Sequence, residues 1–210
     1  MARNNGVSCD RTSERLISSM KQLLWERGYS ATSPAAVQRL AKAGQGSMYH
    51  HFHSKARLAL AAEQRMGEEL KREVAERFTA ASTTYEKIEA YLAPDEHVIR
   101  GCRLGRLIQD EEVASNDELR EPIVETYDWI QAEIVRVLTE GVACGELSPD
   151  VDVDSLAVSI LAIRQGAHVL ARLRGSQEPF RQAGRGIAQL LALASPREDS
   201  AQAAPASLAD

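Results

Sequence analysis

The chain is poor in cysteine and in long apolar runs, which argues against two broad classes of protein. Its 210 residues include three cysteines, Cys9, Cys102 and Cys144, an odd and widely spaced set with no CxxC pair. This pattern argues against a disulfide framework and against a zinc site, and it fits a reducing cytoplasm. The longest uncharged apolar stretches fall far short of the ~20 residues that span a bilayer, and the N-terminus lacks the apolar segment of a secretion signal. We therefore expect a cytoplasmic protein with no membrane partner.

Strand patterns and catalytic motifs are also missing. No segment alternates apolar and polar residues over a sustained length, so the expected fold class is all-α. The sequence contains no HxxxH, ExxH, GxSxG or Walker motif. His50, His51 and His53 stand too close together along the chain to converge on one ion. We expect no catalytic residues, no metal and no cofactor.

Apolar residues recur at helical spacing along almost the whole chain. A first helix is predicted in TSERLISSMKQLLWERG, residues 12–28, with Gly28 as its stop. A short helix begins at Pro34 with Ser33 as its N-cap and runs to about residue 41, and a second covers about 45–51. A long helix follows Ser54. Further helices are predicted at about 84–100, 102–113, 117–144, 152–174 and 177–194. The tail, residues 196–210, is rich in Ala, Ser and Pro and is predicted to be disordered.

Charge is distributed unevenly between the two ends of the chain. The net charge is −5, which taken alone argues against a nucleic-acid partner. Residues 1–60, however, hold nine Lys or Arg and three Asp or Glu, a net charge of +6, so the rest of the chain carries −11. A basic head on an acidic body suits a protein that meets a polyanion with one end only.

The two short helices form the candidate functional site. Two such helices joined by a tight turn and braced by longer ones make a helix-turn-helix, whose second helix can enter a major groove. Gln45 lies in the first turn of that helix, where an amide can pair with a base edge, and Gly46 lets the backbone come close. Phosphate donors are predicted on both short helices and on the long helix that follows; they are Thr32, Ser33, Ser47, Tyr49, His50 and Lys55.

At these residues the chain resembles the TetR (tetracycline repressor-like) family. The stretch GYSATSPAAVQRLAKAGQGSMYHHFHSKARL fits that family's pattern of Gly-Tyr, a Thr-Thr/Ser cap, Gly-Ser/Thr-Leu-Tyr-x-His-Phe and Ser-Lys-x-x-Leu. The resemblance implies a head at residues 1–55 and a helical regulatory and dimerisation body at 56–195. It also implies base readout by Gln45 and Gly46, with His50 possible. The chain departs from the pattern at Lys42, which stands where the family usually has a turn glycine, and at Gly44, which replaces a capping serine.

The acidic body could hold a small-molecule effector. Polar groups occur at helical spacing among apolar ones, as an effector cavity requires. The candidate lining residues are Gln109, Trp129, Glu133, Gln165 and His168. The alternative for each is an ordinary satisfied polar group of the core or of a subunit interface.

The last two predicted helices are apolar over more than one face, so we expect a second subunit to cover them. The resemblance also places the dimer interface there. The predicted contacts of this homodimer are Leu156, Ile160, Ile163, Ala167, Leu170, Phe180, Gly184, Ile187 and Leu191.

These features favour a DNA-binding transcriptional regulator. The leading hypothesis is a dimeric repressor that holds two recognition helices ~34–36 Å apart on a palindromic operator and is released by a small molecule. The alternatives are a ligand-independent regulator or an activator. A different class, a helical small-molecule-binding protein or an enzyme whose head only packs, also remains.

Overall fold

The computed structural model describes residues 5–196, apart from the side chains of residues 5–10 and of Gln45. All regular elements in that range are helical, which confirms the predicted fold class. The elements are α1 (Asn5–Arg27), α2 (Pro34–Ala41), α3 (Gln45–Phe52), α4 (Lys55–Thr79), α5 (Thr84–Leu92), η1 (Val98–Arg100), η2 (Leu107–Gln109), α6 (Glu111–Ala114), α7 (Asp117–Ala143), α8 (Val153–Arg174) and α9 (Glu178–Leu193). Apart from residue 196, the predicted disordered tail lies outside the described residues.

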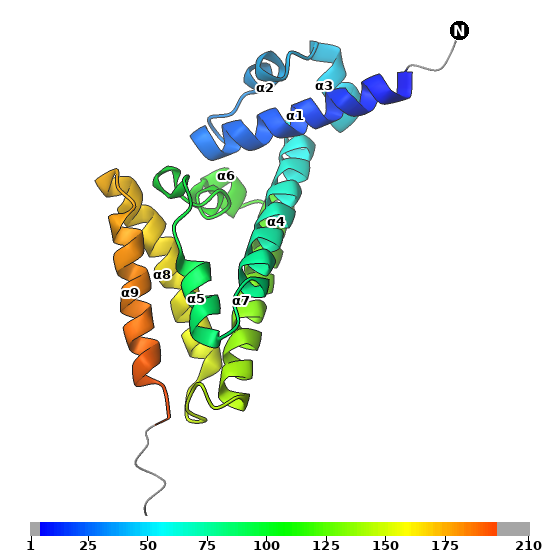
Figure 1. The fold of residues 1–210 in the computed structure, drawn as a ribbon. Helices are drawn as coiled ribbons and strands as arrows, with labels where there is room; N and C mark the ends of the chain where they lie inside the picture. Colours follow the sequence, from blue (N-terminus) through cyan, green and yellow to red (C-terminus); the bar gives the residue numbers. More distant parts are fainter. Residues whose placement is uncertain (1–4, 197–210) are drawn as a thin grey trace, which may run out of the picture.

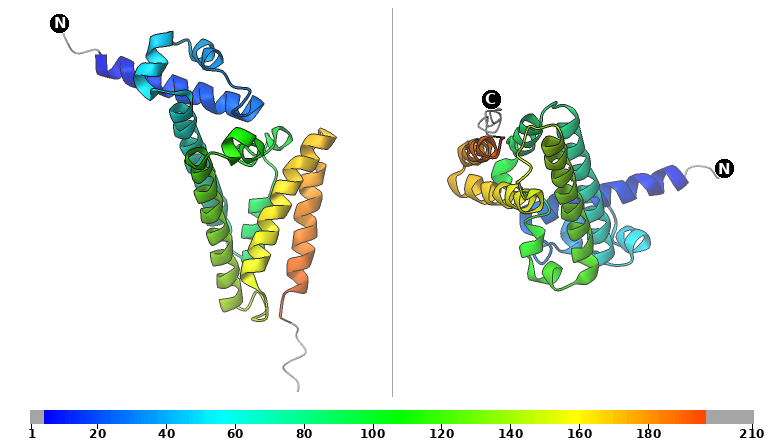
Figure 2. Two further views of the ribbon diagram at one scale, coloured as in Figure 1. Left: turned by 180° about the vertical axis from the view of Figure 1, so that it is seen from behind. Right: turned by 90° about the horizontal axis from the view of Figure 1, so that it is seen from below.

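Helices α1, α2 and α3 form the head at one end of the molecule, and α4 leads from it into the body (Figure 1). In the body α4 lies beside α7, and α8 lies between α7 and α9 (Figures 1 and 2). Side-chain caps fix several of these helix starts. Ser33, Ser54 and Thr83 each accept a hydrogen bond from the backbone N–H three residues later, which satisfies a free helical donor.

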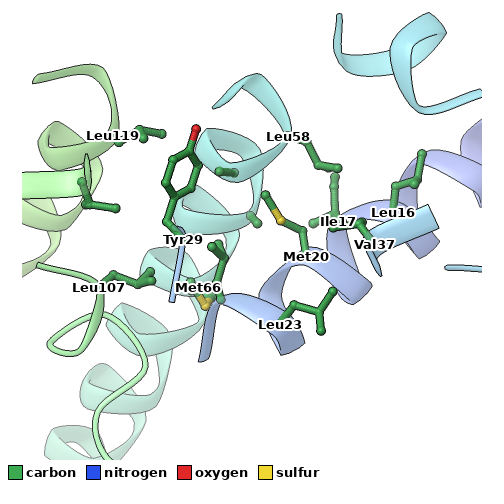
Figure 3. Packing of buried hydrophobic residues seen from close by; sticks show 14 of the residues in the cluster. Leu16, Ile17, Met20, Leu23, Tyr29, Val37, Leu58, Met66, Leu107 and Leu119 are labelled. Atoms are coloured by element: carbon green, nitrogen blue, oxygen red, sulfur yellow. The ribbon is translucent and has the colours of Figure 1, made fainter. Parts of the chain in front are cut away.

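One hydrophobic cluster joins the head to the body. It contains Met20 and Leu24 of α1, Met48 of α3 and Leu58 of α4, all fully buried. Body residues belong to the same cluster, namely Leu104, Leu107, Val113, Leu119 and Ile123. Figure 3 shows part of this packing, with Met66 of α4 and Tyr29 near Leu107 and Leu119 of the body. The head is therefore not an independently packed domain, because its hydrophobic core continues into the body.

One predicted helix is too long, and another is wrong. The helix expected at 84–100 ends at Leu92, because Ala93 precedes Pro94 and adopts an extended conformation, with ψ 134°. The helix expected at 102–113 is replaced by turns, η2 and the short α6. Gly105 lies so close to other side chains that a Cβ there would meet Gln165 Oε1 at 2.4 Å. Tertiary packing thus overrides helical periodicity over residues 93–110.

Glu63 is an acid inside the apolar face of α4. Its side chain is fully buried, and neither carboxyl oxygen has a hydrogen-bond partner among the described residues. Burial first, and then the charge of Asp110, raises the pKa of Glu63 to about 8. The group is therefore mostly protonated at neutral pH.

We expect the stability of the chain to fall as the pH rises from 6.5 to 8. Until the pH approaches 8, the folded chain keeps most of the proton of Glu63, whereas the ordinary pKa of 4.5 means that the unfolded chain has already lost it. His168, with its pKa lowered to about 4, contributes a change of the opposite sign, but chiefly at lower pH. The expected loss in the free energy of unfolding is on the order of 2 kcal/mol.

Urea unfolding of Glu63→Gln measures this loss, and the variant should show almost none of it. Glu68→Gln is the matched control on the same helix. The Glu68 side chain is 74% exposed, and its carboxylate makes only a long ion pair, 3.8 Å, with Arg65. In the control, the free energy of unfolding should fall with pH as steeply as in the natural chain. An equally steep fall in Glu63→Gln would mean that another group causes the loss.

Candidate DNA interface and effector cavity

The turn between α2 and α3 keeps the usual geometry despite its lysine. Lys42 adopts the left-handed conformation, with φ 50° and ψ 44°, and its N–H donates to Arg39 O at 3.3 Å. Ala43 N donates to Gln38 O at 2.9 Å, which completes the hydrogen-bond pattern of a Schellman motif. Lys42 is exposed, so its ammonium lies on the surface of the turn. Gly44 is the N-cap residue of α3 and, as expected, supplies no side-chain hydrogen bond.

Helix α3 turns one side to solvent and the other to the core. Met48 is fully buried, and its sulfur accepts a hydrogen bond from Gln38 Nε2 of α2 at 3.8 Å, which ties the two short helices together. On the other side Gly46 and His50 are exposed, Tyr49 is 45% exposed and Ser47 is half-buried. Gln45 is the first residue of α3, but its side chain lies outside the described part.

Of three candidate phosphate ligands around α2 and α4, Ser33 and Lys55 remain candidates, whereas Thr32 does not. Ser33 is exposed at the start of α2, where its hydroxyl oxygen accepts from Ala36 N at 3.2 Å. Lys55 begins α4 with its Nζ 3.8 Å from the centre of the Tyr29 ring. Thr32 is a correction, because its side chain is 1% exposed and its hydroxyl donates to Gly28 O at 2.6 Å. Thr32 braces the turn after α1 and does not present its side chain to a phosphate.

The body contains a small cavity of about 30 Å³ whose wall includes the head helix α1. Two of the predicted effector residues, Gln165 and His168, line this cavity. A third, Gln109, lines only the wider open cleft beside it. The cavity wall consists of Trp25, Leu70, Glu73, Tyr91, Asp95, His97, Gly101, Cys102, Arg103, Tyr127, Ile130, Arg164, Gln165 and His168. Tyr127 Oη lies 3.1 Å from Cys102 Sγ, and burial is the main cause that raises the pKa of Tyr127.

Two predicted cavity residues lie elsewhere. Trp129 packs against the core formed by α5, α7, α8 and α9, and Glu133 pairs with Arg136 at 2.8 Å on the surface of α7. Sequence reasoning missed the aromatic residues of the wall and Arg164. Arg164 carried a usable signal, because a charged residue in the apolar stretch of residues 156–171 must have a reason to be buried.

Hydrogen bonds tie residues 101–110, of which Gly101, Cys102 and Arg103 line the cavity, to the head. Trp25 of α1 donates from Nε1 to Gly101 O at 2.9 Å. Asp110 accepts from Ser30 N at 2.8 Å and from Ser30 Oγ at 2.6 Å, and these bonds help to lower the pKa of Asp110 although burial opposes them. A displacement of residues 101–110 would therefore pull directly on α1 and on the turn that follows it.

The predicted dimer residues fall mostly inside the chain. Ile160, Ala167, Phe180, Ile187 and Leu191 are at most 2% exposed and pack in the chain's own core, which corrects their assignment to a subunit interface. Gly184 and the half-buried Leu156 and Ile163 lie at the edge of that core, with Gly184 facing Leu92 of α5. Of the nine, Leu170 alone is exposed.

A different apolar face of α8 and α9 is open. It carries Val158, Val169, Leu170 and Leu173 of α8 and Leu190 and Leu193 of α9, which are 48–80% exposed. By length and composition alone α8 could also cross a membrane, and it is the one helix among the described residues of which this is true. A third of its most apolar window is buried inside the chain.

Comparisons with known proteins agree with this architecture. Residues 16–62 match the family model described as bacterial regulatory proteins, tetR family, and residues 82–187 match the tetracyclin repressor-like C-terminal domain. The transcriptional regulator AcuR of Cereibacter sphaeroides is 28% identical over 80% of this chain and 79% of its own. The transcriptional repressor DhaR of Mycobacterium sp. strain GP1 is 24% identical over 80% and 86%.

Among solved structures, a TetR-family regulator from Cytophaga hutchinsonii has the same fold. Its TM-score is 0.81 at 22% identity, covering 91% of this chain and 98% of that one. The two family models together span the head and most of the body. The chain therefore belongs to the TetR family and is a transcriptional regulator.

Proposed function

We propose that this chain is a dimeric repressor whose grip on a palindromic operator is released by a small molecule bound in the body. The observation that carries the proposal is that Trp25 belongs both to the head helix α1 and to the wall of the cavity. A ligand that reshapes the cavity then favours a conformer with a different head position. The affinity for DNA falls by as much as the ligand prefers that conformer.

The DNA surface is the solvent side of α3 with the basic residues around it. Gln45 and Gly46 read base edges, and His50 adds a contact beyond them. Ser33, Ser47, Tyr49 and Lys55 hold phosphates, and the exposed Lys42 lies on the turn beside them.

The subunits meet through the open apolar face of α8 and α9. Leu173 and Leu193, 73% and 80% exposed, are apolar side chains that water covers in a single chain. Because these residues lie on the last two helices, a second copy would form a four-helix seam at the end of the chain. This fits the cytoplasmic dimer expected of the family better than a membrane span does.

Operator binding should become less dependent on salt in Lys55→Ala. Loss of one phosphate contact weakens binding to every sequence and reduces the slope of log affinity against log salt by about one unit. Lys71→Ala is the control, because it lies on the same helix about 24 Å farther from the head. Fluorescence anisotropy with a duplex from the DNA flanking the chain's own gene measures both. An unaltered slope in Lys55→Ala would remove Lys55 from the interface.

Gln45→Ala should change which sequence is preferred and leave the salt slope as it is. An amide that pairs with a base edge distinguishes one base pair from another by roughly 1–3 kcal/mol. Selection from a randomised duplex pool gives the preference of each variant. Gln22→Ala is the matched control, since Gln22 is exposed on α1 and bonded to Glu26 at 2.9 Å. The assignment of base readout fails if both variants select the same sequence as the natural chain.

Leu173→Glu should convert the dimer into monomers. Leu173 lies near the C-terminal end of α8 and is 73% exposed, so a partner subunit seated on this face would cover it. A charge placed in an apolar interface loses its hydration without gaining a partner, at a cost of several kcal/mol. Sedimentation equilibrium measures the association, and operator affinity should fall with it. Val124→Glu is the control, a 45% exposed residue on α7. A dimer as tight as that of the natural chain would place the interface elsewhere.

A further inference from the structure

Arg164 is a permanent positive charge inside the protein. Its residue is 7% exposed on α8, and a guanidinium stays protonated even when buried. Nη1 donates to Tyr91 O, and the group lies 4.7 Å from the centre of the Tyr91 ring and 5.3 Å from that of Phe180. In the part of the chain that the structure describes, no carboxylate lies within 4.0 Å of this guanidinium. Burial of a cation without an ion-pair partner costs several kcal/mol.

The cavity wall carries two acids, Glu73 and Asp95, but neither forms an ion pair with Arg164 in the described part of the chain. Glu73 is held by Arg103 at 2.8 Å. Asp95 lies on the same wall, but its Oδ1 accepts from His97 N at 2.7 Å, and its charge acts on Arg77 and His168 as well. His168 is neutral, because burial and the charge of Arg164 lower its pKa to about 4.

Arg77 of α4 is a second cation near Arg164, although it does not line the cavity itself. Its guanidinium donates to Ala90 O at 2.7 Å and to Ala93 O at 2.9 Å, which are backbone groups without formal charge. Burial and then the charge of Arg164 lower the pKa of Arg77, so the two guanidinium groups lie close enough to repel each other. An anion beside Arg164 would relieve that repulsion.

The size and lining of the cavity limit the anion. A volume of about 30 Å³ has room for two or three water-sized probes, since each needs ~10–15 Å³. Leu70 and Ile130 supply apolar wall, while Tyr127 and Gln165 add uncharged polar groups. An arginine matches a carboxylate with two parallel hydrogen bonds. A short alkyl carboxylate fits if its carboxylate occupies the cavity beside Arg164 and its alkyl end extends into the wider cleft, which shares Tyr127 and Gln165 with the cavity wall. A phosphate would place more polar atoms against the apolar wall.

We propose that the effector of this regulator is a small carboxylate whose charge is taken by Arg164. The inference rests on the proposed function, because it identifies the chemistry of a ligand for the cavity described there. It assigns Arg164 a recognition role for which Cys102, Gln165 and the two tyrosines supply the surroundings.

Calorimetric titration of the natural full-length chain with propionate tests the proposal first. Propionamide has nearly the same shape without the charge, so it should bind at least about tenfold more weakly. Inorganic phosphate should also bind more weakly than propionate. Equal affinities for propionate and propionamide, tighter binding of phosphate, or no binding of propionate would each overturn the proposal.

Arg164→Gln tests the residue. The variant should lose at least about tenfold in propionate affinity, while Arg174→Gln should bind normally, because Arg174 is exposed at the end of α8 and lines neither the cavity nor the cleft. Unaltered binding by Arg164→Gln would contradict the assignment. If Arg164→Gln does not fold, the comparison of propionate with propionamide on the natural chain still decides.

A mobility shift with the flanking duplex separates this inference from the function on which it rests. Release of the duplex by propionate and not by propionamide supports both. Propionate that binds in calorimetry without releasing the duplex upholds the carboxylate site and contradicts ligand release. A duplex released equally well by propionamide contradicts the carboxylate inference and leaves ligand release standing.

Discussion

The packing of α1 against residues 101–114 is the contact on which the regulator depends. Trp25 donates to Gly101 O at 2.9 Å, Ser30 donates twice to Asp110, and Leu24 shares a hydrophobic cluster with Leu107. The same stretch of chain forms part of the cavity wall. Because protein cores pack closely, a shift on one side of this contact has to move the other. Under the proposed function, a change in the shape of the cavity would therefore alter the position of the recognition helix.

The interior of the body retains polar groups that an optimally stable fold would not contain. Among the residues that the structure describes, the carboxyl group of Glu63 has no hydrogen-bond partner and no carboxylate pairs with Arg164, while burial keeps His168 neutral. Each lowers stability, and the surrounding apolar core has to offset that loss. Arg164 and His168 line the cavity, where a ligand can supply what the chain does not. Glu63 lies on α4 beside Ala62 and Met66, which belong to the cluster that joins the head to the body.

Local signals in the sequence were sufficient for the head and insufficient for the body. Ser33, Pro34 and Met48 specify α2 and the inward side of α3 through capping and spacing, which need only neighbouring residues. The prediction for Thr32 was wrong because its hydroxyl donates to a backbone carbonyl in its own turn. On α8, periodicity predicts apolar faces but does not say which face the chain covers itself. Ile160 was therefore predicted at the subunit interface although it is buried within the chain, whereas Leu173 is exposed. Residues 93–110 follow tertiary contacts that no local pattern encodes.

The two tryptophans of the chain permit a direct test of the shared core. Trp25 reports on the junction between head and body, and Trp129 on the core of the body. Thermal unfolding is followed by fluorescence in Trp129→Phe and in Trp25→Phe, each with one remaining tryptophan, alongside circular dichroism of each variant. In each variant the fluorescence midpoint should coincide with the circular dichroism midpoint, because the head and the body unfold as one unit. A Trp25 signal that melts well before the helical signal of the same variant would contradict the account.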